Sequence, residues 1–270
     1  MDIKKKNILL VAGNSLSIIA TIVVNALAVI LPLNGKTTQE LSDNIPNLFV
    51  PAGITFSIWG IIYAFLIIFM IYQILSLRKK QPYDTGYIEK IGGWFILASL
   101  ANITWIFLWH YELVAFSLLA MLVLFFSLLA IYLKLGIGLS ITTLKEKLAV
   151  HVTISIYLGW ITVATIANVS AVLVTQNVGE LLLGQTTWTI LVIAVATLIS
   201  ALILIRRKDI AYNLVIIWAL LGIAIKRSSS DPIYGTQMNI VITTAIAILI
   251  IIIVMLYKVV ISGYKKTAKA

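Results

Sequence analysis

The chain alternates long apolar runs with short polar connections. A membrane crossing takes about 20 apolar residues, so the runs predict eight helices. We expect them at 8–31, 50–77, 92–109, 113–133, 148–174, 187–205, 210–225 and 237–257. The connections at 110–112 and 134–147 are short enough to join neighbouring helices as antiparallel hairpins. The pattern therefore predicts an all-α fold, a polytopic membrane helix bundle with about eight transmembrane helices.

Composition supports this fold class. Hydrophobic residues make up 61% of the 270 residues, and charged residues only 11%, whereas soluble domains carry about 25% charged residues. The chain has no cysteine, which excludes a disulfide framework and thiolate chemistry. The first apolar run follows Lys4–Lys6, and residues 26–28 resemble a signal-peptidase site. Because the run is longer than the 7–15 apolar residues of a signal peptide, we expect an uncleaved first helix.

The basic residues indicate the orientation of the helices. With eight crossings, all Lys and Arg residues except Lys36, Lys226 and Arg227 fall on one side. Positively charged connections stay in the cytoplasm, so we expect a multi-pass protein of the cell (cytoplasmic) membrane with both termini cytoplasmic. The net charge of +10 then reflects topology and contact with the lipid bilayer. We predict no nucleic-acid partner.

Ionisable side chains are absent from the predicted span centres. The ten acidic residues lie in connections or at span ends, as do the basic ones. Ion-coupled transporters and voltage sensors need such groups inside the bilayer. The distribution therefore argues against an ion-driven carrier, but it does not exclude facilitated passage of an apolar molecule.

The connection at 32–49 is long for an external loop. Thr37 and Glu40 have the spacing of a capping box, and Pro46 is placed to end a short helix. Two interpretations remain open, a lid over the bundle and a plain solvated connector.

The second predicted helix carries an aromatic stripe. Phe56, Trp59 and Tyr63 are three and four residues apart, which places them on one helix face. Pro51 stands where the helix is expected to begin, since proline is tolerated in the first turn. This helix displays aromatic rings that a purely lipid-crossing segment does not need.

Three other predicted helices carry matching polar and aromatic stripes. The first presents Asn14, Ser17, Thr21 and Asn25, the third Asn102, Trp105 and Trp109, and the fifth Tyr157, Trp160, Ala164 and Asn168. Amide side chains inside a bilayer need hydrogen-bond partners, so these faces should point inward. At about 1.5 Å per residue, most of these groups lie in the outer half of the bundle. They form either a ligand pocket or a packed helix interface, and the residues alone favour the packed interface.

Catalytic and metal-binding patterns are weak. His110 and Glu112 lie at the external rim, whereas His151 lies at the cytoplasmic start of the fifth span. We interpret all three as interfacial polar caps. The sequence contains no Ser/His/Asp arrangement, phosphate loop or zinc spacing, so we predict no metal site, no catalytic residue and no required cofactor.

Together, three motifs resemble the TspO/MBR family of tryptophan-rich sensory proteins, also called translocator proteins. The second helix carries Pro51, Phe56, Trp59 and Tyr63, the third carries Asn102-x-x-Trp105, and the fifth carries Tyr157-Leu158-x-Trp160 followed by Ala164 and Asn168. The resemblance covers the family's five helices, here residues 8–174. We therefore divide the chain into a TspO-like five-helix core, 1–174, and an additional three-helix region with a basic tail, 175–270.

The resemblance implies a site for a planar apolar ligand such as a tetrapyrrole. Our candidate ligand-binding residues are Asn25, Phe56, Trp59, Tyr63, Asn102, Trp105, Tyr157, Trp160 and Asn168. Indole rings can stack on a macrocycle, and amides can bond its polar groups. By the same resemblance, the loop at 32–49 would close the site.

Several functions remain open at this stage. The first hypothesis is a membrane sensor that binds a tetrapyrrole-like or other apolar molecule. The alternative is a permease, or a permease subunit, for a lipophilic small molecule. Light-dependent porphyrin breakdown is a third hypothesis from the resemblance, although we do not expect an enzyme. The three C-terminal helices are expected to add a packing layer or a homo-oligomer contact.

Overall fold

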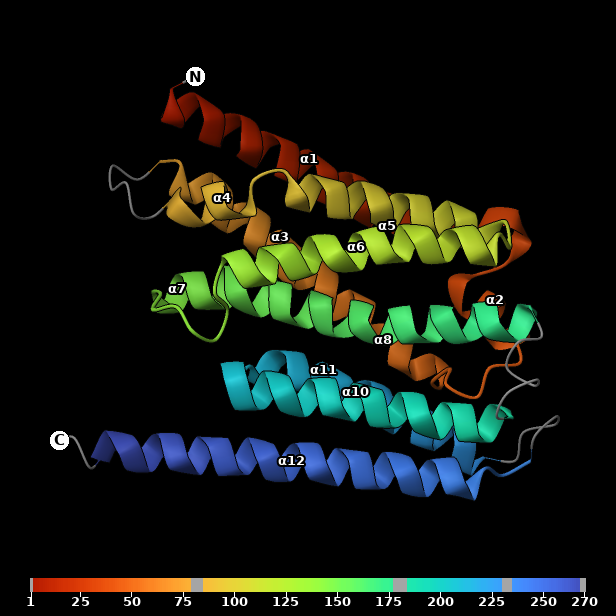
Figure 1. Ribbon diagram of the computed structural model, residues 1–270. Helices are drawn as coiled ribbons and strands as arrows, with labels where there is room; N and C mark the ends of the chain where they lie inside the picture. Colours follow the sequence, from red (N-terminus) through yellow and green to blue (C-terminus); the bar gives the residue numbers. More distant parts are fainter. Residues whose placement is uncertain (1, 79–84, 177–183, 230–234, 268–270) are drawn as a thin grey trace.

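The computed structural model describes residues 2–78, 85–176, 184–229 and 235–267 (Figure 1). Long helices dominate the described part of the chain. They are α1 (Ile3–Ile30), α3 (Ile58–Ser76), α5 (Trp94–His110), α6 (Val114–Lys134), α8 (Val152–Thr175), α10 (Gln185–Arg207), α11 (Ile210–Ser228) and α12 (Met238–Thr267). Each corresponds to one predicted span, so the predicted helix bundle is confirmed.

Seven of the spans are long and apolar enough to cross a membrane. The remaining one, α5, is a shorter apolar helix of 17 residues, or about 26 Å at 1.5 Å per residue. That length reaches the lower limit for a crossing. The protein is therefore a multi-pass membrane protein.

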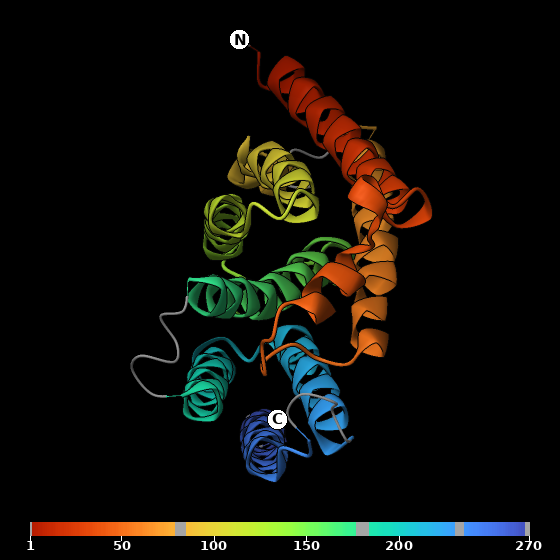
Figure 2. The ribbon, with the colours of Figure 1, turned by 90° about the vertical axis from the view of Figure 1, so that its right-hand side faces the viewer.

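The spans run roughly side by side, with the described starts of α1 and ends of α12 at the same end of the bundle (Figure 1). Helix α8 lies near the middle, in contact with α3, α6 and α11. Helices α1, α3, α5 and α6 surround it on one side, whereas α10, α11 and α12 pack on the other (Figure 2). This central position explains why every residue from Thr153 to Val163 is buried.

The connection before α3 adopts a shape that the sequence did not predict. Pro51 does not begin an α-helix, because the next residues form the 3₁₀ helix η2 (Gly53–Ser57) and α3 starts only at Ile58. The backbone N–H of Ala52 donates to the Gly222 carbonyl of α11 at 2.9 Å. This bond from a distant segment holds the chain in the irregular path.

The short helix expected in the loop at 32–49 is present as α2 (Thr38–Asn44). Thr37 and Glu40 form the predicted capping box, in which each side chain bonds the backbone N–H of the other residue. Helix α2 lies at the end of the bundle opposite the start of α1 (Figure 1). Three small elements were not predicted: η1 (Leu33–Gly35), α4 (Gly86–Ile91) and α7 (Leu144–Glu146), the last followed by a π-helical turn, η4 (Lys147–His151).

A buried polar network joins the C-terminal helices to the others at the end opposite α2. Asp209 caps α11, and one of its carboxylate oxygens accepts hydrogen bonds from Tyr132 of α6 at 2.9 Å and Ser155 of α8 at 2.6 Å. Tyr212 donates to the hydroxyl of Thr162 in α8 at 3.0 Å. Buried hydrogen-bonded networks fix one arrangement of their helices, so α11 is anchored on α6 and α8.

Candidate functional site

Three cavities lie beneath α2, and side chains from α2 line all of them. The central cavity is closed by Thr38, Ser42 and Ile45 on the α2 side and by α8 below. Its lining residues are mostly apolar or aromatic. They are Thr38, Ser42, Ile45, Asn47, Val50, Pro51, Phe56, Trp59, Trp105, Trp109, Trp160, Val163, Ala164, Ala167, Asn168 and Ala171. The loop at 32–49 thus covers a cavity, as the lid interpretation requires.

Three aromatic rings meet on one wall of the central cavity, and the ring of Tyr63 packs against one of them. The ring centroid of Trp160 lies 5.9 Å from that of Phe56 and 6.3 Å from that of Trp59, both edge to face. Trp59 also stacks on Tyr63 at 5.6 Å. Edge-to-face and offset-stacked pairs at such distances stabilise aromatic clusters. The stripe of the second helix therefore meets the Trp of the fifth.

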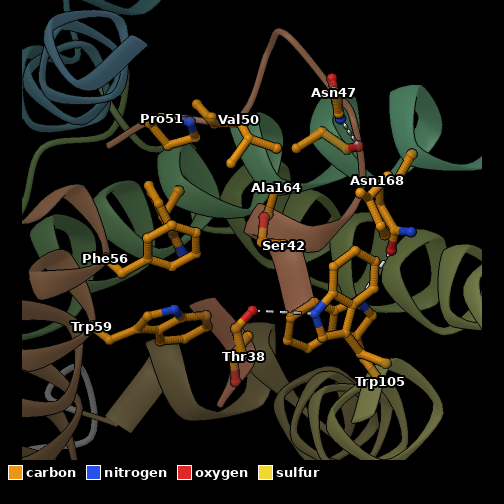
Figure 3. A pocket seen from close by; sticks show the side chains of 16 residues that line it. Thr38, Ser42, Asn47, Val50, Pro51, Phe56, Trp59, Trp105, Ala164 and Asn168 are labelled. Carbon is orange, nitrogen blue, oxygen red and sulfur yellow. Dashed lines mark hydrogen bonds between the residues drawn. The ribbon is translucent and has the colours of Figure 1, made fainter. Parts of the chain in front are cut away.

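Trp105 and Trp109 form the opposite wall. Their rings stack at 5.6 Å, and the indole N–H groups donate to Asn168 at 3.0 Å and to the Thr38 carbonyl at 3.4 Å. Figure 3 shows Phe56 and Trp59 on one side of the cavity and Trp105 and Asn168 on the other, with Thr38 and Ser42 between them. Indoles from two walls thus face a common space.

The predicted amides hold the helices together. The Asn25 amide of α1 donates to the Asn102 side-chain oxygen of α5 at 2.7 Å. Asn168 of α8 accepts from Trp105 and donates to Ser117 of α6 at 3.1 Å. Among the described residues, these amides thus bond mainly to other protein side chains and not to an open space for a ligand.

Not all predicted site residues line a cavity. Phe56, Trp59, Trp105, Trp160 and Asn168 line the central one. Asn25 and Tyr63 join Phe56, Trp59 and Trp105 around the flanking cavity between α1, α3 and α5. Asn102 and Tyr157 line none of the three cavities beneath α2. Tyr157 instead lies behind Trp59, with ring centroids 6.2 Å apart.

The cavities differ in size. The central cavity has a volume of only about 50 Å³. The cavity between α1, α3 and α5 has about 430 Å³, and the one beside Trp109 and Phe116 has about 360 Å³. Thr38, Phe56, Trp59 and Trp105 belong to both the central cavity and the α1-side cavity. These two spaces therefore share one aromatic boundary.

The electrostatic character of the shared space is neutral. Among the described residues, no Asp, Glu, Lys, Arg or His lines the central cavity or the α1-side cavity. Among the described lining groups, the Trp160 indole nitrogen is buried without a hydrogen-bond partner. The described residues also contain no group of three or more His, Asp or Glu side chains placed for a metal ion. The lining therefore combines aromatic faces with a few uncharged polar groups.

Polar contacts fasten α2 over the cavities, and sequence reasoning missed most of them. Lys36 pairs with Glu112 at 2.6 Å, and the Asn34 amide donates to the His110 carbonyl at 3.1 Å. His110, predicted as an interfacial cap, is fully buried. At the other end of α2, Asp43 pairs with Lys226 of α11. The partners in these contacts are far apart in the sequence, so no local sequence pattern predicts the contacts.

The match to a family model decides the relationship. A model described as TSPO-like protein matches residues 9–257. The chain belongs to the TSPO-like protein family. No curated protein and no solved structure matches the chain. The resemblance carried by the three motifs ended at residue 174, but the family model matches further along the chain. Helices α10 and α11 and the first part of α12 therefore lie within the matched region.

Proposed function

We propose that this TSPO-like membrane protein is a sensor that binds an apolar, planar molecule in the joined spaces beneath α2. The single observation that carries the proposal is the convergence of Phe56, Trp59, Trp105 and Trp160 on one neutral cavity. Ligand sites are typically concave and apolar with a few polar groups. Family membership favours a tetrapyrrole-like ligand.

The volumes constrain how such a ligand sits. A drug-sized molecule needs roughly 300–1,000 Å³, so the α1-side cavity of about 430 Å³ is the better receptacle. A macrocycle there would stack on Trp59 and Tyr63, with one edge toward the central cavity. Deeper insertion requires α2 to move away from Trp105 and Trp109.

The neutral lining constrains the ligand's charge. Burying a carboxylate without a cation or hydrogen-bond donors is costly. A tetrapyrrole bound here would therefore place its ring among the indoles and its propionates toward the end of the bundle. Lys36, just before α2, is the single Lys or Arg residue of the segment 32–49, and it pairs with Glu112.

Quenching of tryptophan fluorescence by protoporphyrin IX tests the proposal in purified, full-length protein. The matched variants are Trp59→Phe and Trp160→Phe, which alter the cavity. The control is Trp94→Phe at the other end of α5, where the ring contacts Lys134. Binding that is weakened in the first two variants and retained in the control supports the proposed site.

A transport measurement distinguishes the permease hypothesis from the sensor hypothesis. Protein in vesicles that binds protoporphyrin IX without changing its flux across the membrane acts as a sensor. A protein-dependent flux would favour the permease instead. The same sample under illumination tests porphyrin breakdown, because the porphyrin absorbance would then decline only when protein is present.

We also propose the orientation expected from the basic residues, with α2 outside the cell membrane and both termini in the cytoplasm. The sequence has no cysteine, so a single Asn44→Cys label reports on one site. Reaction with a membrane-impermeant maleimide in intact cells supports this orientation. Reaction only after lysis would reverse it.

A further inference from the structure

One face of α11 reaches the residues that line the cavities. Trp218, Gly222 and Lys226 follow one another at four-residue spacing, which places them on one stripe of the helix. We call these three residues the α11 stripe. Trp218 and Gly222 contact the η2 segment, and Lys226 contacts α2.

The first two residues of the stripe hold η2 at its N-cap and at its middle residue. The Trp218 indole N–H donates to the Thr55 carbonyl at 3.0 Å, and the Gly222 carbonyl accepts the Ala52 N–H at 2.9 Å. Both partners belong to the backbone of the irregular segment that precedes α3. A segment without a regular helix of its own depends on such external bonds.

Gly222 also sets how closely α11 approaches this segment. A methyl group at Gly222 would lie 1.9 Å from the Thr55 hydroxyl oxygen and 2.9 Å from the Pro51 side chain. Both distances are well below van der Waals contact, so any larger residue must displace the segment. Glycine is therefore required for the observed approach.

The segment that α11 holds forms one wall of the cavity. Val50, Pro51 and Phe56 line the central cavity, and Phe56 directly follows Thr55. The Phe56 ring is in edge-to-face contact with Trp160. Because the Thr55 carbonyl is fixed by Trp218, the position of this ring depends on α11.

The third residue of the stripe contacts the cover. Lys226 pairs with Asp43 of α2. A partly exposed pair of this kind contributes little stability by itself. Its effect is to connect α2 to the same helix that holds η2.

The far end of α11 is fixed independently. Asp209 binds Tyr132 and Ser155, and Gly159 of α8 allows the Tyr212 backbone to approach closely. Helix α11 is thus anchored on α6 and α8 at one end and contacts the cavity wall and α2 at the other. Helix α11 therefore does more than cover the outside of the bundle, because it contacts residues that line the cavity.

We propose that Trp218, Gly222 and Lys226 are positioning residues that set the shape of the cavity through η2 and α2, and thereby select its ligand. The ligand part of this inference rests on the proposed function. From the sequence, the C-terminal helices were expected to form a packing layer or an oligomer contact. In this proposal, α11 also helps to determine which ligand the site accepts.

The test compares Gly222→Ala and Trp218→Phe with Gly60→Ala in full-length protein. Gly60 is a helical glycine of α3 with open space around its added methyl group, so it controls for the gain in helix propensity. Backbone hydrogen exchange of residues 50–57 is measured without ligand. We expect roughly tenfold faster exchange in Gly222→Ala and Trp218→Phe, because local opening governs exchange, and no change in Gly60→Ala.

Protoporphyrin IX affinity is measured on the same samples. We expect roughly tenfold weaker binding in Gly222→Ala, as overpacking displaces a wall of the site, with unchanged affinity in Gly60→Ala. Trp218→Phe carries the test if Gly222→Ala does not fold. Unchanged hydrogen exchange of residues 50–57 in the stripe variants that fold would overturn the inference. Faster hydrogen exchange together with wild-type affinity for protoporphyrin IX would overturn it as well. If the wild-type protein does not bind protoporphyrin IX, the proposed function and the selection of a ligand are both refuted. Hydrogen exchange of residues 50–57 still tests whether the α11 stripe positions η2.

Discussion

The indole N–H of Trp105 in α5 donates to the side-chain oxygen of Asn168 in α8 at 3.0 Å. This bond crosses the bundle directly beneath α2, and both side chains line the central cavity (Figure 3). Asn168 is almost fully buried and also donates to Ser117. One amide therefore connects three helices at the site.

The first prediction concerns this amide. Replacing Asn168 with Leu conserves size but leaves the Trp105 indole N–H without its acceptor and removes the bond to Ser117, whose hydroxyl still donates to the Val114 carbonyl. Polar interactions between membrane helices are worth roughly 0.6–1.7 kcal/mol, so we expect a loss of about 1–2 kcal/mol, visible as a fall of several degrees in the melting temperature. Ser170→Ala is the control, because the buried Ser170 hydroxyl has no hydrogen-bond partner in the described structure. Equal melting temperatures for both variants would show that the bond is energetically unimportant.

The second prediction concerns the anchor of α11. Asp209→Ala removes the acceptor for Tyr132, Ser155 and the Tyr212 N–H. Each buried donor left unpaired costs about 1–3 kcal/mol. We expect a destabilisation of at least about 2 kcal/mol and faster proteolysis of the C-terminal helices. Asp209→Asn, which preserves the shape and one acceptor, should lose less than half as much stability.

The third prediction concerns the pH dependence of α2. Hydrogen bonds from the Thr37 backbone and side chain lower the pKa of the exposed Glu40 carboxyl. A lowered pKa in the folded state means that the ionised carboxylate stabilises the helix. This contribution is complete above the ordinary glutamate pKa of about 4.3 and is lost as the pH falls through the lowered value.

A nitroxide label at Asn44→Cys reports this effect, since the chain has no other cysteine. We expect constant mobility from neutral pH down to about pH 5 and increasing mobility in more acidic solution. In Glu40→Gln the label should be mobile to the same degree at every pH. A wild-type pH profile that matches the Glu40→Gln profile would exclude the capping box as the cause.

The fourth prediction concerns ligand charge. Because none of the described residues that line the central or α1-side cavity is Asp, Glu, Lys, Arg or His, neutral ligands escape the cost of burying a carboxylate without a cation. We expect protoporphyrin IX dimethyl ester to bind at least as tightly as the diacid. A diacid that binds more than about tenfold tighter, or 1.4 kcal/mol, would indicate a cationic contact and a different location for the ligand.

Local sequence signals predicted much of the fold. Eight apolar runs gave the eight long helices because a span is defined by its own length and composition. The capping box of Thr37 and Glu40 predicted α2 for the same reason, since both residues lie within one helical turn. The aromatic stripes were also visible, because helical spacing alone brings Trp59 and Tyr63 onto one face.

Features that depend on distant partners were missed. Pro51 was expected to begin a helix, but a bond between Ala52 and Gly222 holds the chain in another path. Asn102 and Tyr157 share helix faces with cavity residues but line none of the three cavities beneath α2, since Asn102 bonds Asn25 and Tyr157 packs against Trp59. The contact of Lys226 with Asp43 joins residues far apart in sequence. No periodicity could reveal these relationships.

Binding of protoporphyrin IX by the Trp59→Phe/Trp160→Phe double variant tests the central claim most directly. Both rings border the central cavity, and the Trp160 indole nitrogen is buried without a hydrogen-bond partner among the described residues. Fluorescence of the bound porphyrin avoids any dependence on the removed tryptophans. We predict an affinity reduced by at least about tenfold, equivalent to 1.4 kcal/mol, with wild-type affinity in Trp94→Phe. Wild-type affinity in the folded double variant would contradict a ligand site beneath α2.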